Sequence, residues 1–252
     1  MRLSITFGIG EGSAIPVNYN HLLVGLIYGI LENAAPEWSK VLHYHGHWSS
    51  DDRPFKLFTF SQLRGGPGTT KVENGRLVFV TNRLEWKFAS PADGTVEMLA
   101  GGLLRAGTVS IGSMRAKVES VKNDPMPDFS EGKARLVAIS PIVASVSDPV
   151  LRHRYLSPDT DEFWKVIGEN LSRKWESFRG SRPEKNITLH PDIAYIQRRR
   201  TSKAITIKPG EIVIGHMVPF EAEGDPEILR FAYETGFGSR NSMGFGMVNI
   251  AH

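Results

Sequence analysis

The sequence contains no cysteine at all. This absence excludes a disulfide framework, a zinc finger and a thiol nucleophile, and it leads us to expect a cytoplasmic protein. No stretch approaches the roughly 18–20 apolar residues of a membrane span, and the first residues turn to glycine and charge too early for a secretory signal. The sequence also lacks a large excess of charge of either sign, because it contains 30 Lys+Arg and 27 Asp+Glu. The balance permits an anionic partner without requiring one, so clustering of the basic residues matters more than their number.

The composition is that of a globular protein, with 40% hydrophobic and 23% charged residues. Its 252 residues can form one large domain or two domains of roughly 100–150 residues. Alternating apolar residues predict a strand at 2–7, and leucine and isoleucine at three- and four-residue spacing predict a helix from Asn20 to Pro36. The other elements expected in the first half are a helix at 36–46, strands at 56–63 and 75–88 joined by a turn at 64–75, a helix at 96–107 and a strand at 108–121.

A segment with two prolines and a glycine, at 122–132, is the best candidate for a domain boundary. Beyond it the same order of elements recurs. The elements expected there are a strand at 135–147 interrupted at Pro141, a helix at 160–178, strands within 194–218 with a turn at Lys208-Pro209-Gly210, a helix at 226–235 and a strand at 247–251. We therefore predict an α+β protein of two tandem ferredoxin-like domains with antiparallel sheets, residues 1–122 and 123–252.

A glycine-rich stretch at 236–246 is the most distinctive local feature. It follows a predicted helix and precedes a predicted strand, which is the reverse of the order in dinucleotide-binding and phosphate-binding glycine loops. Arg240, Asn241 and Ser242 lie at its centre. Bare backbone there can approach a phosphodiester chain closely. A helix-to-strand connector whose two phenylalanines fill the core fits the same residues equally well.

Three histidines alternate in the sequence, at His43, His45 and His47. Alternation on a strand would allow a metal cluster, but the flanking residues follow a helical period that Gly46 interrupts. On a helix, His45 shares the apolar stripe, while His43 lies about 150° away and is free to meet a substrate. We therefore expect no metal, and a histidine-metal hydrolase is the alternative.

Tyr28 also lies about 150° from the apolar stripe of its predicted helix. Glycines neighbour it on that side, so another group can approach the phenol closely. An exposed tyrosine without function, or one covered by the neighbouring domain, is the alternative interpretation.

Basic residues cluster around the end of the helix at 160–178 and again at Arg198–Arg200, with Lys203 close by. We expect the three arginines in a strand or hairpin. Such a run is typical of a solvated edge strand, and it can also follow a phosphate backbone.

Several stretches together resemble the CRISPR-associated endoribonucleases that cut precursor repeat RNA. They are VNYNHLLVGLIYGIL at 17–31, VLHYHG at 41–46, KLFTFS at 56–61, ITIKPG at 205–210 and GFGSRNSMGFGMV at 236–248. The resemblance spans nearly the whole chain, and the glycine-rich stretch is its most specific motif. It implies tandem ferredoxin-like domains and cleavage that needs no metal or cofactor and leaves a 2′,3′-cyclic phosphate and a 5′-hydroxyl.

The resemblance also implies a Tyr/His/Lys catalytic site. Matched motif by motif, its members are Tyr28 in LIYGI, His43 in VLHYH and Lys56 before LFTFS. His45 is an alternative to His43, and Arg53 is an alternative cation, because the connection from His43 to Lys56 is longer than is usual in the family.

The partner expected from the resemblance is CRISPR repeat RNA, held between the domains by a basic hairpin and the glycine-rich loop. The residues expected to bind it are Arg198, Arg199, Arg200, Lys203, Gly236, Gly238, Ser239, Arg240, Asn241, Ser242, Gly244 and Gly246. Association with a CRISPR effector complex and a homodimer are further expectations, and no membrane is involved. The alternative function is that of a non-catalytic RNA-binding subunit of such a complex.

Overall fold

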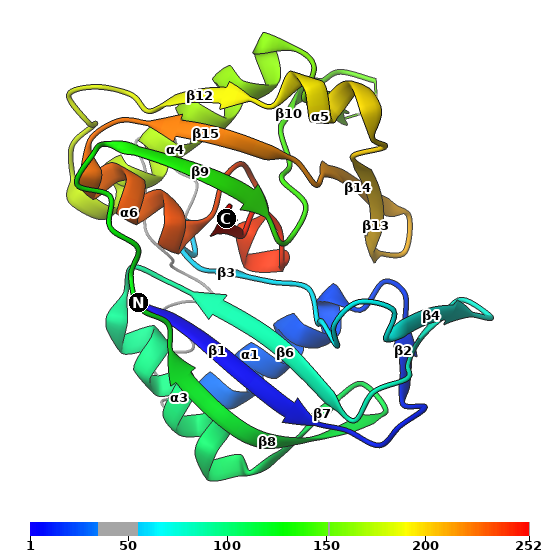
Figure 1. Cartoon of the computed structure of the whole chain (residues 1–252). Coiled ribbons are helices and arrows are strands. Elements are labelled where there is room, and N and C mark those ends of the chain that lie inside the picture. Colours follow the sequence, from blue (N-terminus) through cyan, green and yellow to red (C-terminus); the bar gives the residue numbers. More distant parts are fainter. Residues whose placement is uncertain (35–54, 151, 252) are drawn as a thin grey trace.

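The N-terminal half is built on one antiparallel sheet, seen in a computed structural model that describes residues 1–34, 55–150 and 152–251. The strand order is β3-β6-β1-β8-β7, and α1 and α3 pack together against one face (Figure 1). A small sheet, β2-β5-β4, projects from its side. The elements are β1 (Arg2–Gly8), β2 (Ala14–Pro16), α1 (Asn20–Ala34), β3 (Thr59–Phe60), β4 (Thr70–Glu73), β5 (Arg76–Phe79), β6 (Arg83–Ala89), α3 (Asp93–Ala106), β7 (Thr108–Ile111) and β8 (Met114–Asn123).

The C-terminal half repeats this plan with the strand order β12-β15-β9-β16 and the helices α4 and α6. Two hairpins, β10–β11 and β13–β14, are inserted between its core elements. The elements are β9 (Lys133–Ala138), β10 (Ser145–Asp148), β11 (Arg152–Tyr155), α4 (Asp161–Arg179), β12 (Thr188–Pro191), α5 (Ile193–Arg198), β13 (Ser202–Lys208), β14 (Glu211–His216), β15 (Pro219–Glu223), α6 (Pro226–Thr235), a 3-10 turn (Asn241–Met243) and β16 (Val248–Ile250).

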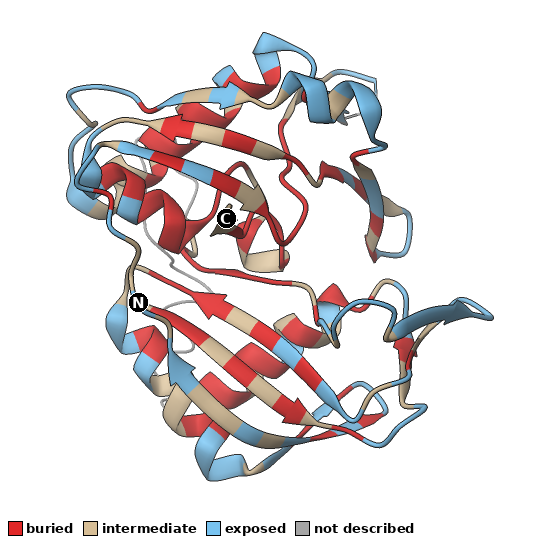
Figure 2. Ribbon diagram, in the orientation of Figure 1, coloured by how far each residue is buried: buried red, intermediate tan, exposed pale blue. Residues whose placement is uncertain are grey.

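Both sheets confirm the predicted ferredoxin-like plan. In each, the strands lie side by side in the order second, third, first, fourth of a β-α-β-β-α-β unit, with β7 added at one edge of the first sheet. Alternation places one face of β1 in the core, where Leu3, Ile5 and Phe7 are buried opposite residues of β6. Figure 2 shows buried residues in the core elements of both halves and along the segment around β3, which lies between the halves.

Several expected elements differ from the observed ones. The strand expected at 75–88 is two strands, β5 and β6, which belong to different sheets, and the turn expected at 64–75 contains β4. The strand expected at 56–63 is reduced to β3. The helix expected at 36–46 lies outside the described residues.

The location of Arg198–Arg200 differs from the strand or hairpin expected from the sequence. The arginine run lies neither in a strand nor in the hairpin, because the side chain of Asp192 caps a short helix, α5, by accepting a hydrogen bond from the backbone N–H of Tyr195 at 2.9 Å. Arg198 ends this helix, and Arg199 and Arg200 connect it to β13. The predicted turn at Lys208-Pro209-Gly210 is confirmed, since β13 and β14 pair on either side of it.

Arg2 joins the two halves of the molecule. Its side chain is 1% exposed, and Nη1 donates a hydrogen bond to the Val248 carbonyl at 2.7 Å. The guanidinium also lies 4.5 Å from the centre of the Tyr233 ring and within ion-pair distance of Asp124. Since Val248 and Tyr233 belong to the C-terminal half, β1 is fixed to that half through a buried cation.

Among the described residues, none of the helices has the length and apolarity to cross a bilayer.

Candidate active site

Tyr28 and Lys56 lie together in the structure. Tyr28 comes from the middle of α1, and Lys56 stands a few residues before β3. The Lys56 Nζ lies 5.1 Å from the centre of the Tyr28 ring, and that ring forms a T-shaped pair with Phe58, with the centroids 6.3 Å apart. Two of the three residues implied by the family resemblance are therefore neighbours. The third, His43, lies outside the described residues, as do His45, His47 and Arg53.

Partial burial changes the acid-base properties of both groups. Loss of solvent raises the pKa of Tyr28 to about 12 and lowers the pKa of Lys56. At neutral pH Tyr28 is therefore a phenol that donates a hydrogen bond, and Lys56 releases its proton more readily than a solvated lysine. The exposed tyrosine considered as an alternative is not observed, because the ring packs against the N-terminal core.

The glycine-rich segment lies between the two halves, beside β3 (Figure 1). From the N-terminal half, the Asn20 amide donates to the Met243 carbonyl at 2.8 Å, and the Thr59 hydroxyl donates to the Phe245 carbonyl at 2.9 Å. From the C-terminal half, Lys174 Nζ donates to the carbonyls of Gly236 and Gly238, both at 2.8 Å. The segment is thus fastened to both domains, and its backbone cannot shift without breaking these bonds.

All four predicted glycines of this segment are buried and have φ between +73° and +85°. A Cβ on Gly244 would stand 2.4 Å from the Phe60 ring, and one on Gly246 would stand 2.0 Å from the Phe237 carbonyl oxygen. Gly236 and Gly238 are similarly crowded, by Asn241 and by the Val143 carbonyl. The glycines are thus required by the protein's own packing, and contact of their backbone with RNA stays a prediction.

The centre of the segment holds one buried and three half-buried polar residues. The buried one, Asn241, donates through Nδ2 to the carbonyls of Phe237 and Phe245 and so holds the loop's shape. Arg240 adopts a left-handed backbone conformation, and its Nη1 lies 2.8 Å from a Glu211 oxygen on β14. Ser239 and Ser242 flank them. Of these residues, Ser239, Arg240 and Ser242 retain surface that a ligand can reach.

A cleft of about 200 Å³ opens where Lys56 meets this segment. A second cleft, of about 350 Å³, lies on the other side of Asn170, Ser239 and Arg240. Because both clefts share these three residues, they form adjoining sites along the junction of the two halves.

Lys174 is one of the basic residues that cluster around the end of the helix predicted at 160–178, and in the structure it is 3% exposed. Burial, reinforced by the neighbouring Arg173 charge, lowers its pKa to about 7. The sequence did carry a signal for this position. Phe163, Ile167 and Leu171 mark the apolar stripe of α4, and Lys174 continues it at the next helical spacing.

The other predicted RNA-binding cations are exposed. Arg198, Arg199, Arg200 and Lys203 form no ion pair with any residue in the described part of the chain. They stand at the start of the β13–β14 hairpin, which reaches the segment just before α1 in the other half through a hydrogen bond from the Thr206 N–H to Asn18 Oδ1 at 3.1 Å.

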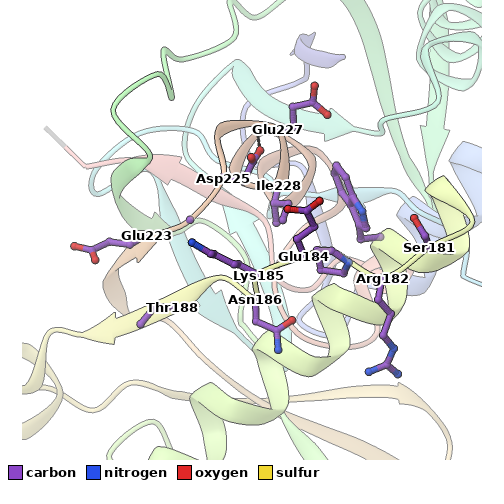
Figure 3. A pocket seen from close by; sticks show the side chains of 13 residues that line it. Ser181, Arg182, Glu184, Lys185, Asn186, Thr188, Glu223, Asp225, Glu227 and Ile228 are labelled. Atoms are coloured by element: carbon purple, nitrogen blue, oxygen red, sulfur yellow. Dashed lines mark hydrogen bonds between the residues drawn. The ribbon is translucent and has the colours of Figure 1, made fainter.

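A larger pocket of about 810 Å³ lies between the end of α4 and the start of α6, and it contains none of the predicted site residues (Figure 3). Acidic side chains are prominent in its wall, at Glu184, Glu223, Asp225 and Glu227. This wall is poorly suited to an anionic ligand, so size alone does not identify the site.

Comparison with known proteins agrees with the fold. The CRISPR-associated endoribonuclease Cas6 1 of Methanocaldococcus jannaschii is 28% identical over 98% of this chain and 92% of its own length. The CRISPR-associated endoribonuclease Cas6 of Pyrococcus furiosus is 28% identical over 94% of this chain and 83% of its own length. A solved structure of a CRISPR-associated protein Cas6 superimposes with a TM-score of 0.79 at 26% identity, covering 100% of this chain and 99% of that one.

Two family models together span almost the whole sequence. The model for the N-terminal part of CRISPR-associated protein Cas6 matches residues 14–122, and the model for its C-terminal part matches residues 123–250. With the tandem ferredoxin-like sheets and the glycine-rich segment between them, these matches place the chain in the CRISPR-associated Cas6 family.

Proposed function

We propose that this protein is an endoribonuclease that cuts CRISPR repeat sequences in precursor RNA and so generates guide RNAs. The observation that carries the proposal is the contact between Tyr28 and Lys56, because Lys56 also lines a cleft together with residues of the glycine-rich segment. The names of the Methanocaldococcus and Pyrococcus relatives support the same activity.

The proposed reaction uses the nucleophile that RNA itself carries. The 2′-oxygen next to the scissile phosphate loses its proton to a base and bonds to phosphorus, while the bond from phosphorus to the 5′-oxygen breaks. That oxygen takes up a proton. The products are a 2′,3′-cyclic phosphate and a 5′-hydroxyl, so atoms and charge balance without a metal ion. The protein supplies in-line placement, proton transfer and charge stabilisation.

Each catalytic residue has a role that fits its chemistry. The phenol of Tyr28, protonated at neutral pH, donates a hydrogen bond to the 2′-oxygen or to a phosphate oxygen. Lys56 stabilises the negative charge that develops on the phosphorane oxygens. His43 acts as acid or base, because the reference pKa of histidine is about 6.5.

RNA binding is assigned to two surfaces beside this centre. Ser239, Arg240 and Ser242 face the clefts, and the exposed cations at Arg198–Arg200 and Lys203 follow the phosphate backbone further along. The glycines and Asn241 give the loop the shape that presents these side chains. A homodimer, association with an effector complex and a cytoplasmic location stay predictions.

The test is cleavage of labelled repeat RNA in excess EDTA, beside the same RNA with a 2′-deoxynucleotide at the scissile position. We expect the first RNA to be cut and the second to survive. Binding of both RNAs without cleavage under any condition would instead identify a non-catalytic subunit. Cleavage that stops in EDTA and returns with added metal would replace the proposed mechanism with a metal-dependent one.

A further inference from the structure

Asn170 is a buried polar residue of α4 whose side-chain oxygen is left without a partner. The residue is 9% exposed, and its Oδ1 accepts no hydrogen bond from any residue that the structure describes. Nearly all buried polar atoms in proteins are hydrogen-bonded, so each exception calls for an explanation. The position of Asn170 supplies one, because it lies in the wall shared by the two clefts beside the glycine-rich segment.

The clefts on either side of Asn170 are suited to an anionic chain. Lys56 lines the first cleft, Arg173 and His153 line the second, and Arg240 belongs to both. Among the described residues that line either cleft, none is acidic. The large pocket beyond α4 differs in this respect, since its wall carries several carboxylates. Phosphate groups are therefore favoured in these two clefts and disfavoured in that pocket.

The shared wall also offers groups that recognise a base. Phe55 lines both clefts, as Asn170 does, so the shared wall contains an aromatic side chain and an amide side chain. Single-stranded RNA is bound by stacking of splayed bases on aromatic side chains and by hydrogen bonds to the base edges. An asparagine amide provides both an acceptor and a donor for such an edge.

We propose that Asn170 hydrogen-bonds to one base of an unpaired RNA strand that crosses both clefts, next to the scissile phosphate held at Tyr28 and Lys56. The inference rests on the proposed function, and it adds a base-reading residue on α4 to that function. Arg240, between the clefts, binds the phosphate that links the two nucleotides. Phe55 stacks on the base that Asn170 contacts.

The test is an abasic scan of repeat RNA made uncleavable by a 2′-deoxynucleotide at the scissile position. Wild-type protein loses affinity when the contacted base is removed. Asn170→Ala binds the intact RNA about 5- to 10-fold more weakly, the loss expected for one hydrogen bond to a base. On the RNA that lacks the contacted base, wild type and variant bind equally, because the interaction is already absent.

Asn186→Ala is the matched control. Its Oδ1 accepts a hydrogen bond from Ser172 at 2.7 Å, and it lines neither of the two clefts. This variant should bind every RNA of the scan as the wild type does.

A second variant, Asn170→Leu, separates an effect on RNA binding from an effect on folding. Because the Asn170 oxygen is unsatisfied in the folded protein, its removal should leave the Tm unchanged or raise it while the affinity falls.

Two outcomes overturn the inference. One is that Asn170→Ala shows the same affinity and the same abasic profile as the wild type. The other is a uniform loss of affinity at all positions with a lowered Tm in both variants, which would mean a structural role. Failure of the proposed function is seen separately, as wild-type protein that binds the fully ribose RNA without cutting it.

Discussion

The Nζ of Lys56 lies 5.1 Å from the centre of the Tyr28 ring, and this contact joins two segments that are far apart in the sequence. Tyr28 belongs to α1, and Lys56 stands in the segment just before β3. A lysine at this distance from an aromatic ring is attracted by the ring's negative face. The pair brings a hydrogen-bond donor and a cation together beside the cleft that Lys56 lines, and both groups can stabilise the charge that develops in phosphodiester transesterification.

The ion pair between Arg240 and Glu211 predicts that removal of the acid strengthens RNA binding. Hydrogen bonds, first from Lys208 and then from Arg240, hold the pKa of Glu211 below its ordinary value, so its charge opposes a phosphate at neutral pH. Glu211→Gln frees Arg240 for the RNA. We expect affinity to rise roughly two- to fivefold and the salt dependence to steepen by up to about one unit. A filter-binding titration at several salt concentrations measures both, and weaker binding would show that Glu211 is needed to hold Arg240 in place.

The crowding at Gly244 predicts that a methyl group there destabilises the protein. In Gly244→Ala the Cβ meets the Phe60 ring at 2.4 Å in a backbone conformation with φ of +85°. We expect a loss of about 2 kcal/mol or more in the free energy of unfolding. Gly180→Ala is the matched control, since Gly180 has φ of +81° with nothing near its Cβ, and it should lose only about 1 kcal/mol. Equal losses in urea unfolding would contradict the close packing of the loop.

The buried amine of Lys174 predicts a stability that rises with pH. Its pKa is about 7 in the folded protein and about 10.4 in the unfolded chain. Between these values the unfolded chain binds more protons, so the free energy of unfolding increases from pH 7 upward, and below pH 7 the cost of the buried charge is present in full. The neutral amine keeps two N–H groups for the carbonyls of Gly236 and Gly238.

Lys174→Met removes this titration. As the pH rises from 7 to 9, the Tm of the wild type should rise relative to that of the variant. Lys165→Met changes an exposed lysine of the same helix and serves as the control. Parallel Tm curves for wild type and Lys174→Met would show that the buried amine does not titrate in this range.

The arginine run after α5 predicts binding that depends on charge rather than sequence. Replacing Arg198, Arg199 and Arg200 together with alanine should weaken binding to all RNAs alike and lower the salt slope by about two units. The cleavage rate of bound RNA should not change, because none of the three arginines lines the two clefts beside the catalytic pair. The double replacement of Arg115 and Lys117, exposed on β8, is the control. An unchanged slope in the triple variant would remove this surface from the RNA path.

The helical and alternating patterns were sufficient to predict most of the fold. The apolar spacing of α1, α3, α4 and α6 and the alternation in β1 are local signals that the tertiary structure obeys. The break between β5 and β6 could not be predicted, because the sheet that a strand joins is decided by partners elsewhere in the chain. The short helix α5 was missed for a different reason, since a single capping contact from Asp192 outweighs the weak preferences of the residues that follow.

The site was predictable only in part. The family resemblance pointed to Tyr28 and Lys56 as candidates, and their contact depends on how α1 packs against the segment around β3. Asn170 and Lys174 lie near the apolar stripe of α4, which marks them as unusual polar residues in the sequence itself. The hydrogen-bond partners of the Lys174 amine are carbonyls of the glycine-rich segment, more than 60 residues later in the sequence. No local sequence pattern contains that information.

The most direct test of the catalytic pair is the single-turnover rate of repeat-RNA cleavage in excess EDTA by wild type, Tyr28→Phe and Lys56→Met. Each variant keeps much of the bulk of the original side chain and loses its polar group. The proposed roles predict a rate about 10²-fold lower in each variant, with affinity for the uncleavable RNA within about twofold of the wild type. Cleavage by both variants at the wild-type rate would contradict the assignment of Tyr28 and Lys56 to the chemistry.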